Sequence, residues 1–421
     1  MTAFAETQHD SGRTFVLLGA GFSRAANDAM PTLSRLTEGV VEKMPGETDE
    51  LSMFNDDLEQ WLSYLAVDQP WLTEDRNLEN RARFVRASQA VHDVITEAET
   101  AAANGPFQMW LQRLVSWLYD EAVNVATFNY DLLLERAAFD LGLLGSWEHA
   151  YVIPLSRREG STIYPSPPEG PQARVYKLHG SINWAYPGMS APVSERITLT
   201  TAKRLGWGRE TRNQNQRRGD EPRYDDLMPM IVPPTLTKSV YYSNTSLRAQ
   251  WRSTAEALSR AENLVVIGYS LPPSDVNARQ FISTLFKGSR VTVVDPCKKV
   301  KKRYVRLLEA RKTEIVHVPN VEEFVDSTCG DLVEWGLKAG EDSYPHPYIN
   351  YNGSNELADS RWTVDPDAPG DPAERLLTET RDEVERRWPR LTQRGRRDIR
   401  ASTISWNADA QLAYLPPRAA N

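Results

Sequence analysis

The chain has 421 residues, 40% of them hydrophobic and 25% charged, which is the composition of a soluble globular protein of two or three domains. The 49 Lys and Arg residues are outnumbered by 57 Asp and Glu residues, so we expect no direct nucleic-acid binding. No apolar run approaches the roughly 18 residues of a membrane-spanning helix, and the N-terminal residues lack the pattern of a secretion signal. We therefore expect a cytoplasmic protein that does not contact a membrane.

The two cysteines and six histidines argue against a metal centre. Cys297 and Cys329 are too few for a disulfide framework or for a zinc site made of four thiolates. The histidines are scattered and show no spacing typical of metal ligands. We therefore expect no bound metal.

Six short runs of β-branched and apolar residues recur along the chain without the alternation of a half-exposed strand. Such runs predict strands that are buried on both faces, as in a parallel sheet. They cover residues 14–18, 122–126, 174–178, 263–267, 291–294 and 314–318. Because helical segments lie between several of them, the sequence predicts an α/β fold with a doubly wound, Rossmann-like parallel sheet.

A long helical stretch separates the first two predicted strands, at about residues 30–120. Its apolar residues recur at i, i+3, i+4 and i+7, which is typical of a helix with one buried face. One such series is Leu58, Trp61, Leu62 and Leu65; a second is Phe107, Trp110, Leu111, Leu114 and Leu118; a weaker one is Phe84, Ser88, Val91 and Ile95. This helical insertion either packs against the sheet or forms a small domain of its own.

We interpret residues 1–340 as one domain that also contains a polar loop insertion at about 156–226. Five arginines of this loop, between 206 and 223, belong either to a solvated loop or to a surface that faces a partner or a nucleotide. Five prolines after Gly340 predict a linker, and residues 373–388 predict a charged helix. The C-terminal extension, 341–421, also carries seven arginines between 386 and 400, as a solvated face or a contact for an acidic partner.

The first predicted strand opens into Gly19-Ala20-Gly21-Phe22-Ser23. Glycines here permit a sharp turn and a close approach of the backbone, and a helix starting near Ser23 would point its free N–H groups at a phosphate. The third glycine of the dinucleotide fingerprint would fall at Arg24 and is absent. The alternative is a strand-to-helix turn without a ligand.

Polar residues follow the second and third predicted strands. Asn129 and Asp131 lie in the sequence TFNYD, where Asp131 could instead cap the next helix. His179 lies in KLHG and is suited to act as a general base near neutral pH, although a histidine alone at this place is more often a structural hydrogen-bonding residue. Ligands bind at the carboxyl ends of strands in sheets of this kind.

The fourth and fifth predicted strands end in GYSLPPSD, which contains Gly268 and Ser270, and in VDP, which contains Asp295. An acidic residue at such a strand end can accept hydrogen bonds from ribose hydroxyls, or it can form an Asp-Pro turn. Five polar or glycine-rich clusters thus follow five predicted strands, and a doubly wound sheet brings those ends to one crevice.

Together the motifs GAGFS, TFNYD, KLHG, GYSLPPSD and VDP resemble those of the sirtuin family, and more closely its bacterial sirtuin-like branch, over about residues 14–318. The resemblance implies an NAD site. It implies Asn129, Asp131 and His179 as catalytic residues. It implies that Gly19, Ala20, Gly21 and Ser23 bind the pyrophosphate, and that Gly268, Ser270 and Asp295 hold the adenosine half.

Protein-deacylating sirtuins carry a zinc module with four cysteines after the histidine, and this chain has no cysteine between His179 and Cys297. The resemblance therefore implies an NAD hydrolase of bacterial antiphage defence, forming nicotinamide and ADP-ribose. It further implies a homo-oligomer with a separate partner, a HerA-type ATPase in preference to a short Argonaute-like protein. The alternatives are an NAD-dependent deacylase or ADP-ribosyltransferase, and a non-catalytic module that binds NAD or a related nucleotide.

Overall fold

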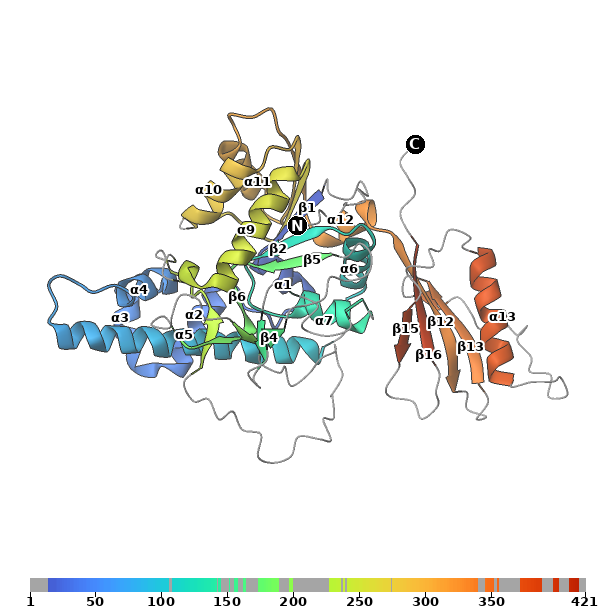
Figure 1. The fold of residues 1–421 in the computed structure, drawn as a ribbon, viewed down its shortest axis with the longest axis horizontal. Helices are drawn as coiled ribbons and strands as arrows, with labels where there is room; N and C mark the ends of the chain where they lie inside the picture. The colour runs from blue at the N-terminus through green and yellow to red at the C-terminus, as the bar shows by residue number, and fades with distance from the viewer. Residues whose placement is uncertain are drawn as a thin grey trace.

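The structure, a computed structural model, describes most of the chain (Figure 1). The described residues are 14–105, 108–141, 143–144, 151, 155–157, 162–163, 173–188, 197–199, 227–235, 238, 241–273, 275–339, 345–351, 354–355, 372–387, 397–400 and 409–415.

A six-stranded sheet forms the centre of the fold, in the order β11-β10-β9-β1-β2-β5. All neighbouring strands in it run parallel. The strands are β1 (Thr14–Leu18), β2 (Asn124–Thr127), β5 (Arg174–Lys177), β9 (Asn263–Ile267), β10 (Arg290–Val294) and β11 (Glu314–Val318). This confirms the predicted doubly wound parallel sheet, with each strand within two residues of its predicted bounds.

The sheet is buried on both faces, which is why its strands read as unbroken apolar runs. Val16 and Leu18 of β1 point into one hydrophobic cluster, whereas Phe15 and Leu17 point into the other. The first cluster includes residues of the helical insertion, and the second includes helices that follow β5. Burial on both faces fixes the register, because a slip of one residue would exchange the two sets of side chains.

The helical insertion lies between β1 and β2. Its helices are α2 (Leu33–Lys43), α3 (Thr48–Ser52), α4 (Leu58–Leu65), α5 (Glu74–Ala103) and α6 (Met109–Asp120), after the short α1 (Ala20–Ala26) and with the 3-10 helix η2 (Pro45–Glu47). Leu58, Trp61, Leu62 and Leu65 are all buried and share a cluster with Val16 of the sheet. The insertion therefore packs against the sheet. Phe107 lies outside the described residues.

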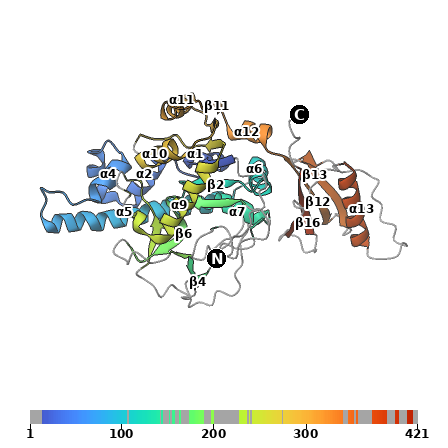
Figure 2. The same cartoon turned by 45° about the horizontal axis from the view of Figure 1, so that its top comes forward.

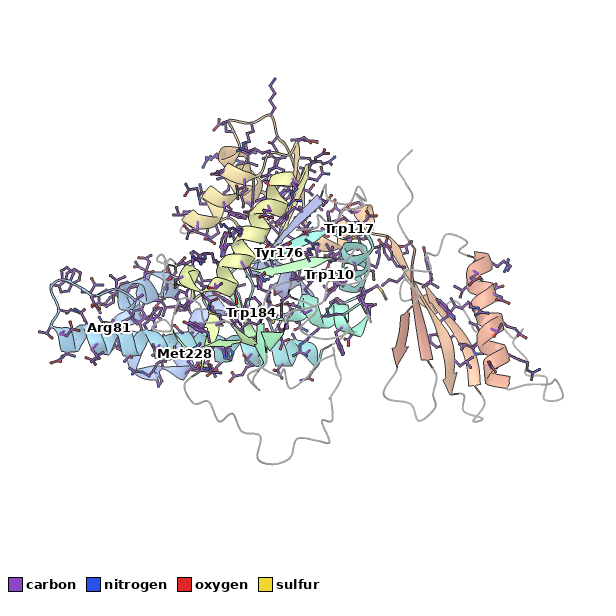
Figure 3. All side chains as sticks on the ribbon, viewed as in Figure 1. Arg81, Trp110, Trp117, Tyr176, Trp184 and Met228 are labelled. Carbon is purple, nitrogen blue, oxygen red and sulfur yellow. The ribbon has the colours of Figure 1, made fainter. Side chains whose placement is uncertain are left out.

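The remaining helices of this part are α7 (Leu133–Asp140), η3 (Tyr241–Ser243), α9 (Thr245–Arg260), α10 (Val276–Leu285), α11 (Lys298–Leu307) and α12 (Val321–Thr328). Helices α9, α10 and α11 cover the face of the sheet that carries Phe15 and Leu17. On the other face, Trp117 of α6, labelled in Figure 3, packs edge-on against Phe324 of α12 with ring centroids 6.2 Å apart. Within the described residues, no helix is long and apolar enough to cross a membrane.

A second sheet occupies part of the region predicted as a polar loop insertion at about 156–226. Its order is β4-β3-β7-β6-β8, and its strands are β3 (Leu155–Arg157), β4 (Thr162–Ile163), β6 (Gly180–Tyr186), β7 (Thr198–Leu199) and β8 (Met228–Ile231). Strand β6 begins directly after His179, so this sheet continues from the carboxyl end of β5. The arginines between 206 and 223 lie outside the described residues.

The C-terminal part forms a third, antiparallel sheet, where the sequence predicted only a linker and a charged helix. Its order is β14-β13-β12-β16-β15, and its strands are β12 (Asp331–Ala339), β13 (Pro345–Tyr351), β14 (Ser354–Asn355), β15 (Arg397–Arg400) and β16 (Asp409–Leu415). The predicted helix is present as α13 (Pro372–Arg387), and its Val384 packs on Val333 and Trp335 of β12. Figures 1 and 2 show this sheet and α13 at one end of the molecule.

Two of the five prolines that suggested a linker, Pro345 and Pro347, lie in β13; Pro372 begins α13, and Pro366 and Pro369 lie outside the described residues. Strand β13 pairs with β12 along its length, but β14 pairs only with Asn350 and Tyr351. Pro345 and Pro347 therefore lie on a stretch with a described neighbour on one side only, where a missing N–H is tolerated. Strand β12 ends at Ala339 and β13 begins at Pro345, so the proposed domain boundary at 341 lies between two paired strands.

Candidate functional site

The five sequence motifs lie at one edge of the parallel sheet. Gly19 follows β1, Asn129 follows β2, His179 follows β5, Gly268 follows β9 and Asp295 follows β10. Because all six strands are parallel, their carboxyl ends share this edge. Strand β1 lies between β2 and β9, so the order of the strands reverses beside Gly19, where ligands bind in folds of this class.

Ser23, Asn129 and Asp131 form one hydrogen-bonded network. The amide Nδ2 of Asn129 donates to Ser23 Oγ and to the carbonyl oxygen of Gly19, both at 2.8 Å. The hydroxyl of Ser23 donates in turn to Asp131 Oδ2 at 2.6 Å. Asp131 Oδ1 also accepts from Leu133 N at 3.2 Å, near the start of α7, so the predicted helix-capping role accompanies its place in the network. These bonds fix the orientation of a carboxylate and an amide that are both buried.

A cavity of about 160 Å³ lies over this network. Ala20 and Ser23 of α1, Asn129, Asp131 and Leu36 of α2 are among the residues that line it. Pockets that enclose a whole small molecule usually span about 300–1,000 Å³. The described cavity is therefore of the size of one sugar or one aromatic ring, and its polar wall is the Asn129–Asp131 pair.

Buried charged side chains hold the backbone of Asp131 in place. Lys177 is 1% exposed, and its ammonium donates to the backbone oxygen of Asp131. Glu135 Oε1 lies 3.2 Å from the same ammonium and accepts a hydrogen bond of 3.0 Å from the hydroxyl of Tyr151. Lys177 was not among the predicted site residues, although a lysine at the end of a strand predicted to be buried on both faces is the signal that could have identified it.

His179 is 6% exposed and packs on Phe128, with ring centroids 4.8 Å apart. Burial is the largest cause that lowers its pKa to about 3; Lys238 lowers it further, and Asp275 opposes the shift. Nε2 of the imidazole is buried and has no hydrogen-bond partner within the described part of the protein. His179 does not line the cavity, whereas Phe128 does, so the imidazole borders the cavity through that ring.

The three motif glycines lie where two backbones cross. Gly21 N donates to the carbonyl oxygen of Gly268 at 2.9 Å, and Gly19 N donates to Ile267 O at 3.0 Å. A Cβ on Gly268 would lie 2.2 Å from Phe22 N, and a Cβ on Gly19 would lie 2.6 Å from Gly268 O. Gly268 also has a φ of +63°. Close packing thus requires these glycines, and the N–H of Gly21 is bonded within the protein.

Ser270 and Asp295 lie on the other side of β1 from Asn129. Ser270 is exposed, and its backbone oxygen accepts from Arg303 Nη1 at 2.7 Å. Asp295 Oδ1 accepts from Cys297 N at 2.8 Å, which is the bond expected of an aspartate in a turn. Neither residue lines the described cavity.

Comparisons with known proteins give one family match. Residues 123–315 match the family described as SIR2-like domain, and this span contains Asn129, Asp131 and His179. No curated protein matches the chain.

Solved structures give weaker similarities. A Sir2 structure in complex with the inhibitor EX-527, 2′-O-acetyl-ADP-ribose and a deacetylated p53 peptide is 12% identical, with a TM-score of 0.32 over 75% of this chain and 91% of that one. A serine-to-alanine mutant of a Sir2 homologue in complex with ADP-ribose is 13% identical, with a TM-score of 0.35 over 75% of this chain and 89% of that one. Residues 123–315, which include the motifs that follow β2, β5, β9 and β10, are therefore similar to the SIR2-like domain.

Proposed function

We propose that the chain is an NAD⁺ hydrolase that cleaves the bond between nicotinamide and ribose and releases nicotinamide and ADP-ribose. The observation that carries this proposal is the network of Ser23, Asn129 and Asp131 on the wall of a ring-sized cavity. Asn129 and Asp131 lie within the span that matches the SIR2-like domain.

The proposed chemistry needs orientation more than strong acid catalysis. Nicotinamide leaves from a cationic form, so its departure needs no proton, and the ribose becomes oxocarbenium-like, as in other glycosidic cleavages. We assign to Asn129 the orientation of the ribose and of one water molecule. We assign to Asp131 a contact to a ribose hydroxyl or the support of Asn129. His179 would accept a proton from the water or a hydroxyl, a role that typically contributes about 10²–10⁴-fold.

The ring of Phe128 constrains this mechanism. It lines the cavity and contacts the imidazole of His179, which does not line the cavity itself. The proposal therefore requires the Phe128 ring to shift when NAD⁺ enters, so that His179 reaches the ribose.

For the rest of the dinucleotide, we propose that the turn after β1 holds the pyrophosphate and that the ends of β9 and β10 hold the adenosine half. Because Gly21 N is bonded to Gly268 O, Gly21 would contribute a close approach of the backbone rather than its N–H. The proposed contacts are Gly19, Ala20, Gly21 and Ser23 for the pyrophosphate, and Gly268, Ser270 and Asp295 for the adenosine half.

Unregulated hydrolysis of NAD⁺ would harm the cell that makes the protein, so the proposed activity needs a regulator. We propose a cytoplasmic effector of antiphage defence, acting as a homo-oligomer with a separate sensor, of which a HerA-type ATPase is the favoured kind. The proposal involves NAD⁺ as substrate and no metal, because two cysteines cannot build the zinc module of deacylating sirtuins.

The test is NAD⁺ turnover by the purified chain, alone and with its partner protein, with the products identified. Asn129→Ala should lower the rate by at least about 100-fold, because an unoriented water loses most of the advantage of proximity. Asn124→Ala is the matched control: Asn124 lies at the other end of β2, where it accepts a hydrogen bond from Tyr176, and its loss should leave the rate within about twofold. Transfer of ADP-ribose to an acceptor, or NAD⁺ left intact by the full assembly, would exclude hydrolysis as the function.

A further inference from the structure

The loop between β9 and α10 carries an acidic residue that the proposed function does not use. Asp275 follows the GYSLPPS sequence, directly before α10, and is 5% exposed. Two residues of this loop, Gly268 and Leu271, have positive φ values of 63° and 52°. Leu271 is fully buried, so packing holds a backbone conformation that is unfavourable for a leucine. The bent loop thus places a carboxylate inside the protein.

Two groups hold this carboxylate. The hydroxyl of Tyr269 donates to Asp275 Oδ2 at 2.8 Å, and the ammonium of Lys238 lies 3.3 Å from Asp275 Oδ1. Lys238 is 6% exposed, so both charges of the pair are buried. Burial raises the pKa of Asp275, but its interactions with His179 and Lys238 and the hydrogen bond from Tyr269 outweigh burial, so the pKa is lowered.

The pair is connected to His179 through two aromatic rings. The ring of Tyr269 packs on Phe128 with centroids 4.6 Å apart, and Phe128 packs in turn on the imidazole. Within the described residues, Lys238 and Asp275 are the charged groups that act on His179, with opposite signs. The buried Nε2 of His179 has no hydrogen-bond partner there. The protonation state of a buried imidazole without a hydrogen-bond partner depends on the charges around it, and here those charges are a buried pair of opposite sign.

We propose that Asp275 and Lys238 are positioning residues that determine whether His179 carries a proton. Between turnovers, Lys238 disfavours a second positive charge and keeps the imidazole neutral and ready to accept. When His179 becomes an imidazolium, the carboxylate of Asp275 stabilises it. This inference rests on the proposed function, in which His179 is the base.

The proton balance of the step is complete. The bond from ribose to nicotinamide breaks with its electron pair going to the nicotinamide nitrogen. A water oxygen forms the new bond to the ribose carbon, and its proton moves to His179. That proton then leaves to solvent, which restores the neutral imidazole beside Lys238.

Histidine NMR on the full chain tests the charge pair without any need for activity. In the unchanged protein, the His179 signal, assigned with His179→Gln, should not titrate between pH 8 and pH 5. Lys238→Met removes the repulsion and leaves Asp275 without its cationic partner, so it should raise the His179 pKa from about 3 to about 5, and the signal should be about half shifted at pH 5. The double variant Asp275→Asn/Lys238→Met should return the signal to neutral behaviour. A Lys238→Met signal like that of the unchanged protein, or a shift that persists in the double variant, would overturn the inference.

Turnover of NAD⁺ provides the second readout. Asp275→Asn should lower kcat by about tenfold or more with KM within about twofold, because Asp275 stabilises the imidazolium and does not contact substrate. Lys43→Met, which removes an exposed lysine paired with Glu97, is the control and should keep kcat. Removing one partner of a buried pair can prevent folding, so the double variant, in which neither charge remains, serves as the folded reference.

The two proposals fail in distinguishable ways. If the His179 titration behaves as expected but the chain does not hydrolyse NAD⁺, the charge pair stands and the proposed function falls. If Asn129→Ala abolishes hydrolysis but Asp275→Asn leaves kcat unchanged, the proposed function stands and the charge pair is overturned.

Discussion

The polar side chains at the carboxyl edge of the sheet differ in whether they have hydrogen-bond partners. Asn129 and Asp131 are both hydrogen-bonded to Ser23 on the cavity wall, whereas His179 is buried beside Phe128 with Nε2 unpartnered in the described structure. Folding therefore favours the neutral imidazole over the imidazolium, so the folded protein is less stable in acid. The hydrogen bonds hold the side chains of Asn129 and Asp131 in one geometry, whereas Nε2 of His179 is available to bind a new partner.

This difference predicts how stability depends on pH. Burial lowers the pKa of His179 to about 3, below the value of about 6.5 in the unfolded chain. Between these values the unfolded chain binds a proton that the folded chain does not, so stability falls as pH drops below about 6.5. Urea unfolding should show that the free energy of unfolding falls between pH 7 and pH 5. This fall should be smaller in His179→Gln, by at most about 2 kcal/mol.

The lowered pKa of Asp275 does not obscure this comparison. A carboxylate with a lowered pKa loses its stabilising effect only as pH falls below about 4, outside the range measured. Equal pH dependence in the two proteins would mean that His179 is protonated in the folded state at pH 5.

At the scale of elements, the site depends on the contact between the turn after β1 and the turn after β9. Gly21 and Gly268 meet backbone to backbone, and a hydrogen bond from Gly21 N to Gly268 O closes the contact. The turn that carries Ser23 is therefore positioned by a segment from the second half of the chain. The close approach of the two backbones is sufficient to explain why residues 21 and 268 are glycines.

A methyl group at Gly268 should break this contact. Gly268→Ala places a Cβ 2.2 Å from Phe22 N in a residue with positive φ, and we expect a loss of about 3 kcal/mol in unfolding free energy. Gly46→Ala is the matched control, because its Cβ would meet nothing within 4 Å, and it should change stability by less than about 0.5 kcal/mol. Similar midpoints for the two variants in denaturant would show that the turns can separate without cost.

The elements differ in how far the sequence predicts them. The six strands of the parallel sheet were predictable because burial on both faces leaves unbroken apolar runs such as that of β1. The C-terminal sheet was not, because the prolines of β13 and the charged α13 indicate a linker when no pairing partner is known. At the site, Asn129 and Asp131 follow from position after a strand. The partnership of Lys238 with Asp275 joins two distant segments, and no local pattern reveals it.

At the scale of the whole molecule, polar contacts join the C-terminal sheet to the part of the protein that contains the parallel sheet. Arg113 of α6 donates to Gly330 O at 2.9 Å and pairs with Asp326 at 2.6 Å and with Asp331 at 3.3 Å. Gly330 N donates to the hydroxyl of Tyr414 in β16 at 2.8 Å. One arginine and one tyrosine thus bind the segment leading into β12, and Leu332 and Tyr414 add apolar packing against the main hydrophobic cluster.

Arg113→Met should loosen this junction. It removes three polar contacts around residues 326–331 but keeps most of the side-chain volume, and we expect a loss of about 1–2 kcal/mol. Limited proteolysis should then cut between α12 and β12 several times faster than in the unchanged protein. Arg76→Met, which removes an exposed pair with Glu79, is the control and should not change the rate of cutting. Equal cutting of the two variants would show that hydrophobic packing alone holds the junction.

The order of the strands has a consequence for synthesis on the ribosome. Strand β1 pairs with β2 on one side and with β9 on the other, so the N-terminal strand lacks one neighbour until residues 263–267 have emerged. The loop that carries Tyr269 and Asp275 is translated later still. A nascent chain therefore contains Asn129 and His179 long before the emergence of β9 completes the sheet on both sides of β1.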